Sequence, residues 1–349
     1  MSATPRALPH RRLSTAGALL LSATTAAVVL LPGAALAAEP DSVTSHSGAT
    51  TAQETGRIDA YWTAARMKLA GAMVPEITPV PADDTTPDDP RPLPPNTPDP
   101  GGVWAHGGAV DRNVGRLFFT FSDGYDGSCT ATVVTSANRS TVVTAAHCLR
   151  GVGAASADDT WRHNLYFVPG YRNGTKPLGG FSIKSMATSS RWDADPKSTT
   201  PNDVVIAGYD TGVLVANPSP EGRRVADVTG SQRIAFTEPV ADEFIHTFGY
   251  PKDRLNDPTA KYAGSRMIHC AGPDRPAPKA PLLWGESCDM GHGASGGPHF
   301  ARFDTRTGSG TLVGVTTTSD DLGGGQPGTL YATRFAGSAH RLYDWAQSR

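Results

Sequence analysis

Two short segments carry side chains suited to nucleophilic chemistry. Residues 144–148 read Thr-Ala-Ala-His-Cys, and residues 293–298 read Gly-Ala-Ser-Gly-Gly-Pro. A histidine within hydrogen-bond reach of a serine hydroxyl can remove its proton and so make the oxygen a nucleophile. We therefore predict that His147 is a general base and Ser295 a nucleophile.

The position of His147 suits a general base. It precedes Cys148, so a disulfide at that cysteine would hold the imidazole in place. Ala145 and Ala146 are small enough for the backbone to pack closely below the ring. The alternative is a structural histidine with a satisfied hydrogen bond.

Glycines surround Ser295 and leave its hydroxyl open to a substrate. Gly293 lets the backbone turn its amide toward the space in front of Ser295. The amides of Gly293 and Ser295 are thus a candidate oxyanion hole. The alternative is an ordinary Gly-Ser loop in a chain with 38 glycines.

An acid is needed to orient the histidine, and we predict that it is Asp203. This residue precedes the run Val-Val-Ile at 204–206, so it should be partly buried and need an N–H donor such as imidazole. Asp193, Asp195 and Asp210 compete for the role, but none precedes so apolar a run. The alternative is a turn residue at the start of a strand.

The elements that must position these residues have the pattern of short strands and turns. Apolar and β-branched runs predict strands at 116–121, 129–135, 141–144, 204–206, 233–237, 244–248, 312–318 and 329–333. Helical periodicity is clear at the C-terminus, over about 338–347. The pattern predicts an all-β sandwich or barrel with a C-terminal helix.

Taken together, these motifs resemble the chymotrypsin-like (trypsin-like) family of serine endopeptidases. The order His147, Asp203, Ser295 is the order of that family, and the strings Thr-Ala-Ala-His-Cys and Ser-Gly-Gly-Pro are typical of it. Phe-Gly-Tyr-Pro at 248–251 and His-Cys at 269–270 are similar to a bacterial secreted branch near the glutamyl endopeptidases.

The resemblance covers about residues 102–349. It implies two six-stranded antiparallel β-barrels, about 102–220 and 221–349, with the active site between them. His147 and Asp203 would come from the first barrel and Ser295 from the second. The implied substrates are proteins or peptides.

Two positions depart from the family pattern. Members activated by a liberated N-terminus carry an aspartate directly before the nucleophile, whereas this chain has Ala294. We therefore predict that it does not use that switch. Glutamyl endopeptidases have a histidine in the strand that lines the primary pocket, and here Thr316 and Thr317 stand in that strand.

The primary specificity is left with two interpretations. Asp289 lies six positions before Ser295, where trypsin-like members place the acid of the pocket floor, which favours Lys or Arg substrates. His292 and His269 leave a preference for glutamate open. The alternative for Asp289 is a surface loop residue beside Cys288.

Four cysteines remain after the N-terminal forty residues, which predicts two disulfides in an exported chain. Three pairings are possible. Sequence proximity favours Cys129–Cys148 and Cys270–Cys288. Zinc is the alternative, although no two cysteines have the short spacing of a structural zinc site.

Composition excludes several classes. The 349 residues include 31 Lys and Arg against 33 Asp and Glu, a formal net charge of −2, whereas a nucleic-acid-binding chain would be strongly basic. The 38 glycines and 29 prolines suit a β-rich chain rather than a coiled coil. No metal-ligand cluster or nucleotide loop stands out, so we expect no cofactor and no metal, and we expect a monomer. Calcium at Asp320 and Asp321 is the alternative to a solvated acidic turn.

Residues 1–37 have the three parts of a secretory signal peptide. Arginines form a basic start, an apolar stretch follows over about 13–31, and Ala-Leu-Ala at 35–37 is a cleavage signal. A membrane span is the alternative. We expect cleavage after Ala37, secretion and no membrane anchor afterwards.

Residues 38–101 differ from the rest of the chain. Ten of the 26 residues from Pro75 to Pro100 are proline, which predicts an extended acidic linker over 75–101. Before it, we predict one helix over about 58–73, within a pro-segment (38–74) that docks on the main domain and is later removed. The alternative is a disordered N-terminus.

Two other function classes compete with a peptidase. A catalytically inactive binding module would keep the fold, but the intact triad argues against it. An esterase with the same triad is favoured by Gly-x-Ser-x-Gly at 293–297, but an α/β-hydrolase has its histidine last in the chain.

Overall fold

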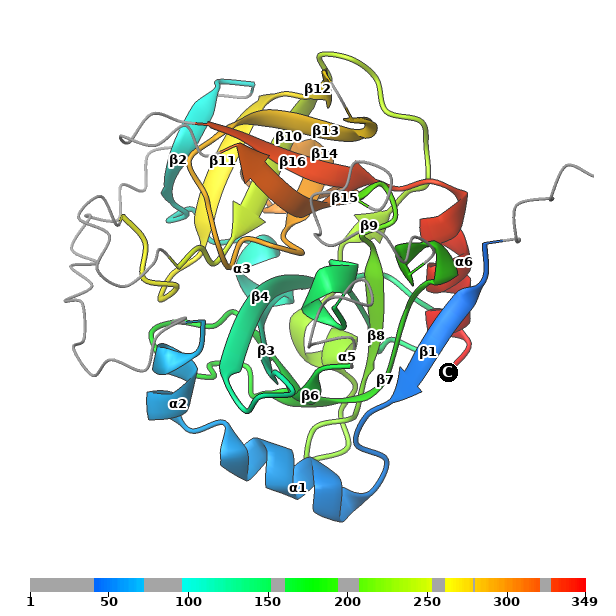
Figure 1. Cartoon of the computed structure of the whole chain (residues 1–349). Coiled ribbons are helices and arrows are strands. Elements are labelled where there is room, and N and C mark those ends of the chain that lie inside the picture. Colours follow the sequence, from blue (N-terminus) through cyan, green and yellow to red (C-terminus); the bar gives the residue numbers. More distant parts are fainter. Residues whose placement is uncertain are drawn as a thin grey trace, which may run out of the picture. The chain divides into compact units, whose positions relative to one another are not determined.

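The protein is described here from a computed structural model (Figure 1). The structure describes residues 41–71, 96–151, 161–193, 207–252, 261–278, 280–320 and 328–349. The predicted signal peptide, most of the predicted linker, Asp203 and Asp321 lie outside these residues. In the described ranges, no helix has both the length and the apolar character needed to cross a bilayer.

The first sheet closes into a barrel. Its seven strands follow the order β1-β7-β6-β3-β4-β5-β8, and β7 also pairs with β8, so that six strands form a closed ring and β1 is an addition at its edge. The strands are β1 (Val43–Ser47), β3 (Val114–Thr120), β4 (Asp126–Val133), β5 (Thr141–Thr144), β6 (His163–Pro169), β7 (Phe181–Ser189) and β8 (Gly212–Ala216).

The second sheet has nine strands in the order β12-β13-β16-β15-β14-β10-β11-β2, with β9 paired to β15 in parallel. Its strands are β2 (Asp99–Val103), β9 (Arg233–Ile234), β10 (Phe244–Gly249), β11 (Ile268–Pro273), β12 (Arg275–Ala277), β13 (Ala280–Cys288), β14 (Pro298–Asp304), β15 (Ser309–Asp320) and β16 (Gly328–Arg334). The two curled sheets confirm the predicted trypsin-like, all-β class. Among the described residues the second sheet is a half-barrel rather than a closed one.

Strand β3 has a continuous apolar run in its sequence, and the structure shows why apolar and polar residues do not alternate there. Successive side chains of a strand point to opposite faces. Leu117 and Phe119 enter the core cluster of the first barrel, whereas Phe118 enters a second cluster that contains Trp62. Both faces of β3 are covered, so every residue of the strand is buried.

The N-terminal segment, defined here as residues 41–71, packs on the first barrel, with β1 beside β7 (Figure 1). The predicted single helix over 58–73 is wrong, because the chain forms α1 (Ala52–Tyr61) and α2 (Ala64–Leu69). Thr51 and Glu54 form a capping box at α1. Thr63 caps α2 by accepting from the amide of Arg66, so the chain turns between the two helices.

Each end of the main domain packs on the sheet that is formed mostly by the other half of the chain. Strand β2 pairs with β11 in the second sheet, although the sequence placed residues from 102 onward in the first barrel. Helix α6 (Gly337–Gln347) confirms the predicted C-terminal helix and packs on β7 and β8 of the first barrel. Two short helices, α3 (Val110–Asn113) and α5 (Val225–Thr229), lie in connections between strands.

Both disulfides have the pairing that sequence proximity favoured. Cys129 in β4 is joined to Cys148, and Cys270 in β11 is joined to Cys288 in β13. Within the described residues, Cys129, His147 and Cys148 are close enough to suggest a metal site. Two of these three are half-cystines, so they offer no thiolate to a zinc ion.

Candidate active site

His147 lies in a 3-10 turn, Ala146–Cys148, that directly follows β5. Its backbone is held on both sides: Ala145 and Ala146 are fully buried, and Cys148 is bonded to Cys129 in the neighbouring strand β4. The imidazole itself is partly exposed, with 21% of its surface accessible. The turn thus fixes the backbone while leaving the ring within reach of a substrate.

A buried carboxylate, that of Asp210, holds the imidazole of His147. Asp210 Oδ2 lies 2.7 Å from His147 Nδ1, and Asp210 Oδ1 accepts a hydrogen bond of 2.8 Å from the backbone amide of His147. The hydroxyl of Thr317, from β15 of the other sheet, also donates to Asp210 Oδ2. These three donors satisfy a carboxylate that has no exposed surface.

This contact revises the predicted acid. Asp203 lies outside the described residues, and the position at His147 Nδ1 is taken by Asp210. Asp210 also stands at the mouth of an apolar strand, since β8 (Gly212–Ala216) reads Gly-Val-Leu-Val-Ala and is buried throughout. The criterion used for the sequence was an acid just before an apolar run. Both Asp203 and Asp210 precede such a run, and only the tertiary structure distinguishes them.

The loop that carries Ser295 lies against the first barrel. The amide of Thr130 in β4 donates to Ser295 O at 2.8 Å, and the Thr130 hydroxyl donates to Gly293 O at 2.9 Å. Cys148 Sγ lies 3.9 Å from Ser295 O. The structure thus brings the Ser295 backbone next to the turn that holds His147, although 147 positions separate Cys148 from Ser295.

Gly293 is required by the shape of this loop. Its φ is +89°, and a Cβ atom there would lie 2.7 Å from Tyr250 O. A side chain at this position would therefore be both strained and in collision with the backbone. In the described part of the chain, the amides of Gly293 and Ser295 donate to no protein acceptor. Both remain available to a ligand oxygen, as the predicted oxyanion hole requires.

Comparison with known proteins bears on the fold. No protein-family model matches the chain, and no curated protein does. Among solved structures, the protease Anisep from Arthrobacter nicotinovorans is 28% identical, with a TM-score of 0.56, over 68% of this chain and 96% of that one. A thermostable serine protease, AL20, from an extremophilic microorganism is 26% identical, with a TM-score of 0.57, over 69% and 99%.

The chain has the fold of the chymotrypsin-like serine proteases. A Glu endopeptidase, solved in complex with MPD, has a TM-score of 0.52 and 15% identity over 73% of this chain and 99% of that one, and it supports the fold alone.

Within this chymotrypsin-like fold, Ala294 lies in an apolar setting. It is fully buried in a cluster with Met290 and the Cys270–Cys288 disulfide. A Cβ atom at Gly249 would lie 3.0 Å from Ala294 Cβ, so the side chain packs tightly on β10. The site directly before Ser295 is therefore filled by a methyl group and offers no charge to an ammonium.

Asp289 does not present a free carboxylate. Lys261 Nζ contacts Asp289 Oδ2, and the Tyr262 hydroxyl donates to Asp289 Oδ1 at 2.8 Å. The Asp289 amide donates to Pro100 O, and a Cβ atom at Gly101 would collide with the carboxylate. The carboxylate is thus held against β2 and paired with a cation of the same chain.

The histidines and threonines of the predicted pocket have different environments. His292 is exposed on the Ser295 loop, whereas the hydroxyl of Thr317 donates a hydrogen bond to Asp210. His269 is buried in β11, with Nε2 2.9 Å from Nδ1 of His246. Thr316 Oγ1 lies 3.2 Å from Nε2 of His299, a histidine that the sequence analysis had not considered.

His299 is fully buried in β14, and burial lowers its pKa to about 3. The ring is therefore neutral near neutral pH and brings no positive charge to the pocket strand. Its position directly after the Ser-Gly-Gly-Pro string, four residues after Ser295, was the signal that could have drawn attention to it.

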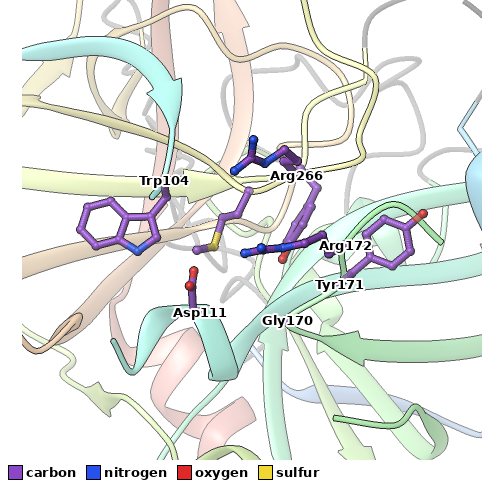
Figure 2. Close-up of a pocket in the computed structure, with 8 residues that line it drawn as sticks. Trp104, Asp111, Gly170, Tyr171, Arg172 and Arg266 are labelled. Atoms are coloured by element: carbon purple, nitrogen blue, oxygen red, sulfur yellow. The ribbon is translucent and has the colours of Figure 1, made fainter. Parts of the chain in front are cut away.

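A small cavity lies near the Ser295 loop but does not suit a substrate. It is lined by Trp104, Asp111, Gly170, Tyr171, Arg172, Tyr250, Arg266 and Met267 (Figure 2). Its volume of 20 Å³ has room for about one water molecule. Figure 2 shows that the side chains of Arg172 and Arg266 reach into this space, so it is a polar cavity filled largely by the protein itself.

Proposed function

We propose that this protein is a secreted serine endopeptidase that hydrolyses peptide bonds. In this proposal Ser295 is the nucleophile, His147 the general base and acid, and Asp210 the orienting acid. The observation that carries the proposal is the contact of His147 with a fully buried Asp210, which Thr317 satisfies from the second sheet. Asp210 replaces Asp203 in the role that the sequence had predicted.

The chemistry follows from these contacts. Ser295 Oγ attacks the scissile carbonyl carbon while His147 Nε2 takes the hydroxyl proton. Asp210 keeps the Nδ1 proton on the far side of the ring and stabilises the imidazolium that forms. The amides of Gly293 and Ser295 hold the oxyanion of the tetrahedral intermediate. His147 then gives its proton to the leaving amine, and a water molecule hydrolyses the acyl-enzyme by the same steps.

The pairing of Asp289 bears on specificity. A carboxylate that is already paired with Lys261 and bonded by Tyr262 would have to give up these partners to bind a cationic substrate side chain. We therefore propose that Lys and Arg are not the preferred residues before the cleaved bond. The competing outcome is a preference for acidic residues before the cleaved bond. His292 is the candidate partner for such a residue because it is exposed, whereas His299 and His269 are buried.

Secretion belongs to the same proposal. Two disulfides suit an oxidising compartment such as the exterior of a bacterial cell. A secreted form that begins at Ala38 would support the predicted cleavage of residues 1–37, and a membrane-bound form that retains them would contradict it.

A peptide library tests the activity and the specificity together. The secreted protein should cut peptides and react with a fluorophosphonate, and Ser295→Ala should abolish both, with turnover reduced on the order of 10⁶-fold. Cuts mainly after Lys or Arg would contradict the proposal for Asp289. Absence of both cutting and labelling in the wild-type chain would contradict the peptidase and favour a binding module.

A further inference from the structure

The N-terminal segment is built into the core of the protein. Five residues of β1 pair with β7, from Val43 opposite Ser189 to Ser47 opposite Ser185. Trp62, between α1 and α2, has no exposed surface, and its indole N–H donates to Asn164 O at 2.6 Å. This is the burial expected of a permanent part of a fold.

The end of the segment binds Lys252, which follows strand β10 of the second sheet. Lys252 Nζ donates to the carbonyls of Lys68, Leu69 and Ala70 at 2.9, 3.1 and 3.0 Å. These carbonyls lie at the C-terminal end of helix α2. The last carbonyls of a helix receive no hydrogen bond from the helix itself, and this end carries a partial negative charge. All three N–H donors of the ammonium are therefore used by the N-terminal segment.

A second buried cation has partners at the same helix end. Arg116, from β3, has no exposed surface and donates to Met67 O and Ala70 O at 3.3 and 3.1 Å. It also donates to the Ser128 hydroxyl, at 2.7 Å. The last turn of α2 thus accepts hydrogen bonds from two cations, one in β3 of the first barrel and one just after β10 of the second sheet.

Lys252 also contacts the loop of the nucleophile through its backbone. Its amide donates to His292 O at 2.6 Å, three residues before Ser295. The next residue of the loop, Gly293, lies so close that a Cβ atom there would be 3.2 Å from Lys252 N. One residue therefore joins the N-terminal segment, through its side chain, to the oxyanion-hole loop, through its backbone.

The position before the nucleophile gives this link its importance. In a chymotrypsin-like fold that has Ala294 at this site, no ion pair at residue 294 can hold the loop. Hydrogen bonds must hold it instead, and those at its start come from Lys252 and Thr130.

We propose that the N-terminal segment is retained in the active enzyme, and that Lys252 is a positioning residue through which the segment orders the oxyanion-hole loop. The inference rests on the proposed peptidase function. It also replaces the prediction that residues 38–74 are a pro-segment that is removed on activation.

The physical reason is the cost of a buried ammonium. Burial and the neighbouring Arg116 lower the pKa of Lys252 to about 7. The buried ammonium therefore depends on hydrogen bonds to strong acceptors to stay charged. Without the α2 carbonyls the ammonium would have to turn toward water. Residues 251–252 would then move with it, and the hydrogen bond to His292 O would be lost.

Lys252→Met tests the link, because it removes the three donors and keeps the apolar stem and the backbone amide. We expect kcat for peptide cleavage to fall about 10- to 100-fold, since a small misplacement of catalytic groups costs up to about 10²-fold. We expect KM to change less than threefold. Lys252→Gln keeps a side-chain donor and should recover part of the loss.

Lys176→Met is the matched control. Lys176 also ties the segment to the barrel, through Asp59 Oδ1 at 2.9 Å, but it makes no contact with the Ser295 loop in the described residues. We expect this variant to lower the thermal midpoint and leave kcat within about twofold. An equal loss of kcat in both variants, or full kcat in Lys252→Met, would overturn the proposed role of Lys252.

A cut between the segment and the main domain tests retention without any core substitution. A specific protease site placed between residues 72 and 95 should give two pieces that co-elute, retain full cleavage activity and are both found in native mass spectra of the fluorophosphonate-labelled protein. A labelled, fully active protein that lacks residues 41–71 would overturn the proposal. Failure of the uncut wild-type chain to label at all would instead count against the peptidase itself.

Discussion

The two halves of the candidate active site are held by different kinds of contact. The half that carries His147 is fixed by a disulfide and by a buried carboxylate, and its main contacts arise within the first barrel. The half that carries Ser295 belongs to the second sheet, but its backbone is anchored by Thr130 of the first barrel and by Lys252. The difference teaches that the histidine half is ordered mainly by its own barrel, with one hydrogen bond to Asp210 from Thr317 of the second sheet, whereas the nucleophile half depends more on contacts from elsewhere in the chain.

The largest expected effect tests the acid of the histidine half. Asp210→Asn should reduce kcat about 10⁴-fold, because the amide can no longer hold the productive tautomer of His147 or stabilise its imidazolium. Asp203→Asn should cost less than about tenfold. Steady-state cleavage of one peptide by both variants decides between the two acids, and a larger loss for Asp203→Asn would restore the original prediction.

The next effect concerns the N-terminal segment on which the nucleophile half depends. Trp62→Ala removes a fully buried ring that packs on Phe118 at a centroid distance of 5.2 Å, and it should cost about 3–5 kcal/mol in the free energy of unfolding. Leu69→Ala, in the same segment but 64% exposed, should change it by less than about 0.5 kcal/mol. Urea denaturation measures both, and equal values would show that the segment is not part of the cooperative fold.

A third variant sharpens the comparison within a single strand. Thr130→Val removes a hydroxyl that donates to Gly293 O and accepts from the Tyr250 amide, both at 2.9 Å, and should lower kcat about 10-fold. Thr132→Val changes an equally buried threonine of β4 whose hydroxyl has no hydrogen-bond partner among the residues that the structure describes. It should leave kcat unchanged and should not destabilise the fold. Loss of activity in Thr132→Val alone would contradict the anchoring role of Thr130.

The smallest effect is a pH dependence at the nucleophile half. Burial lowers the pKa of His299 from 6.5 to about 3, so the unfolded chain binds more protons than the folded chain between these values, and stability falls as the pH falls through this range. His299→Gln should reduce that slope by up to about 1.4 kcal/mol per pH unit between pH 6 and 4, measured by urea denaturation in the Ser295→Ala background. The exposed His340→Gln is the control for replacing a histidine outside the core. No change in His299→Gln would mean that His299 is not buried as a neutral ring.

Several features could be predicted from the sequence because neighbouring residues determine them. The turn at His147, the glycine-rich loop at Ser295 and both disulfides lie within short segments whose local chemistry restricts their conformation. Strands such as β5 and β10 were found because β-branched and apolar runs stand between turn residues. The strand β8 was missed, although the same apolar pattern is present there, because Val204–Ile206 was preferred.

Only the tertiary structure decided the contacts between distant segments. The acid of His147 lies 63 positions away, and its third donor, Thr317, lies 107 positions from Asp210. The carbonyls that hold Lys252 are 182 to 184 positions before it. A residue type specifies what a side chain can bind, whereas the folding of the two sheets determines which of several suitable partners comes within reach. Sequence alone therefore determined the class of fold and pointed to His147 and Ser295 as candidates, and the structure determined the contact of Asp210 with His147, the paired state of Asp289 and the contacts of Lys252.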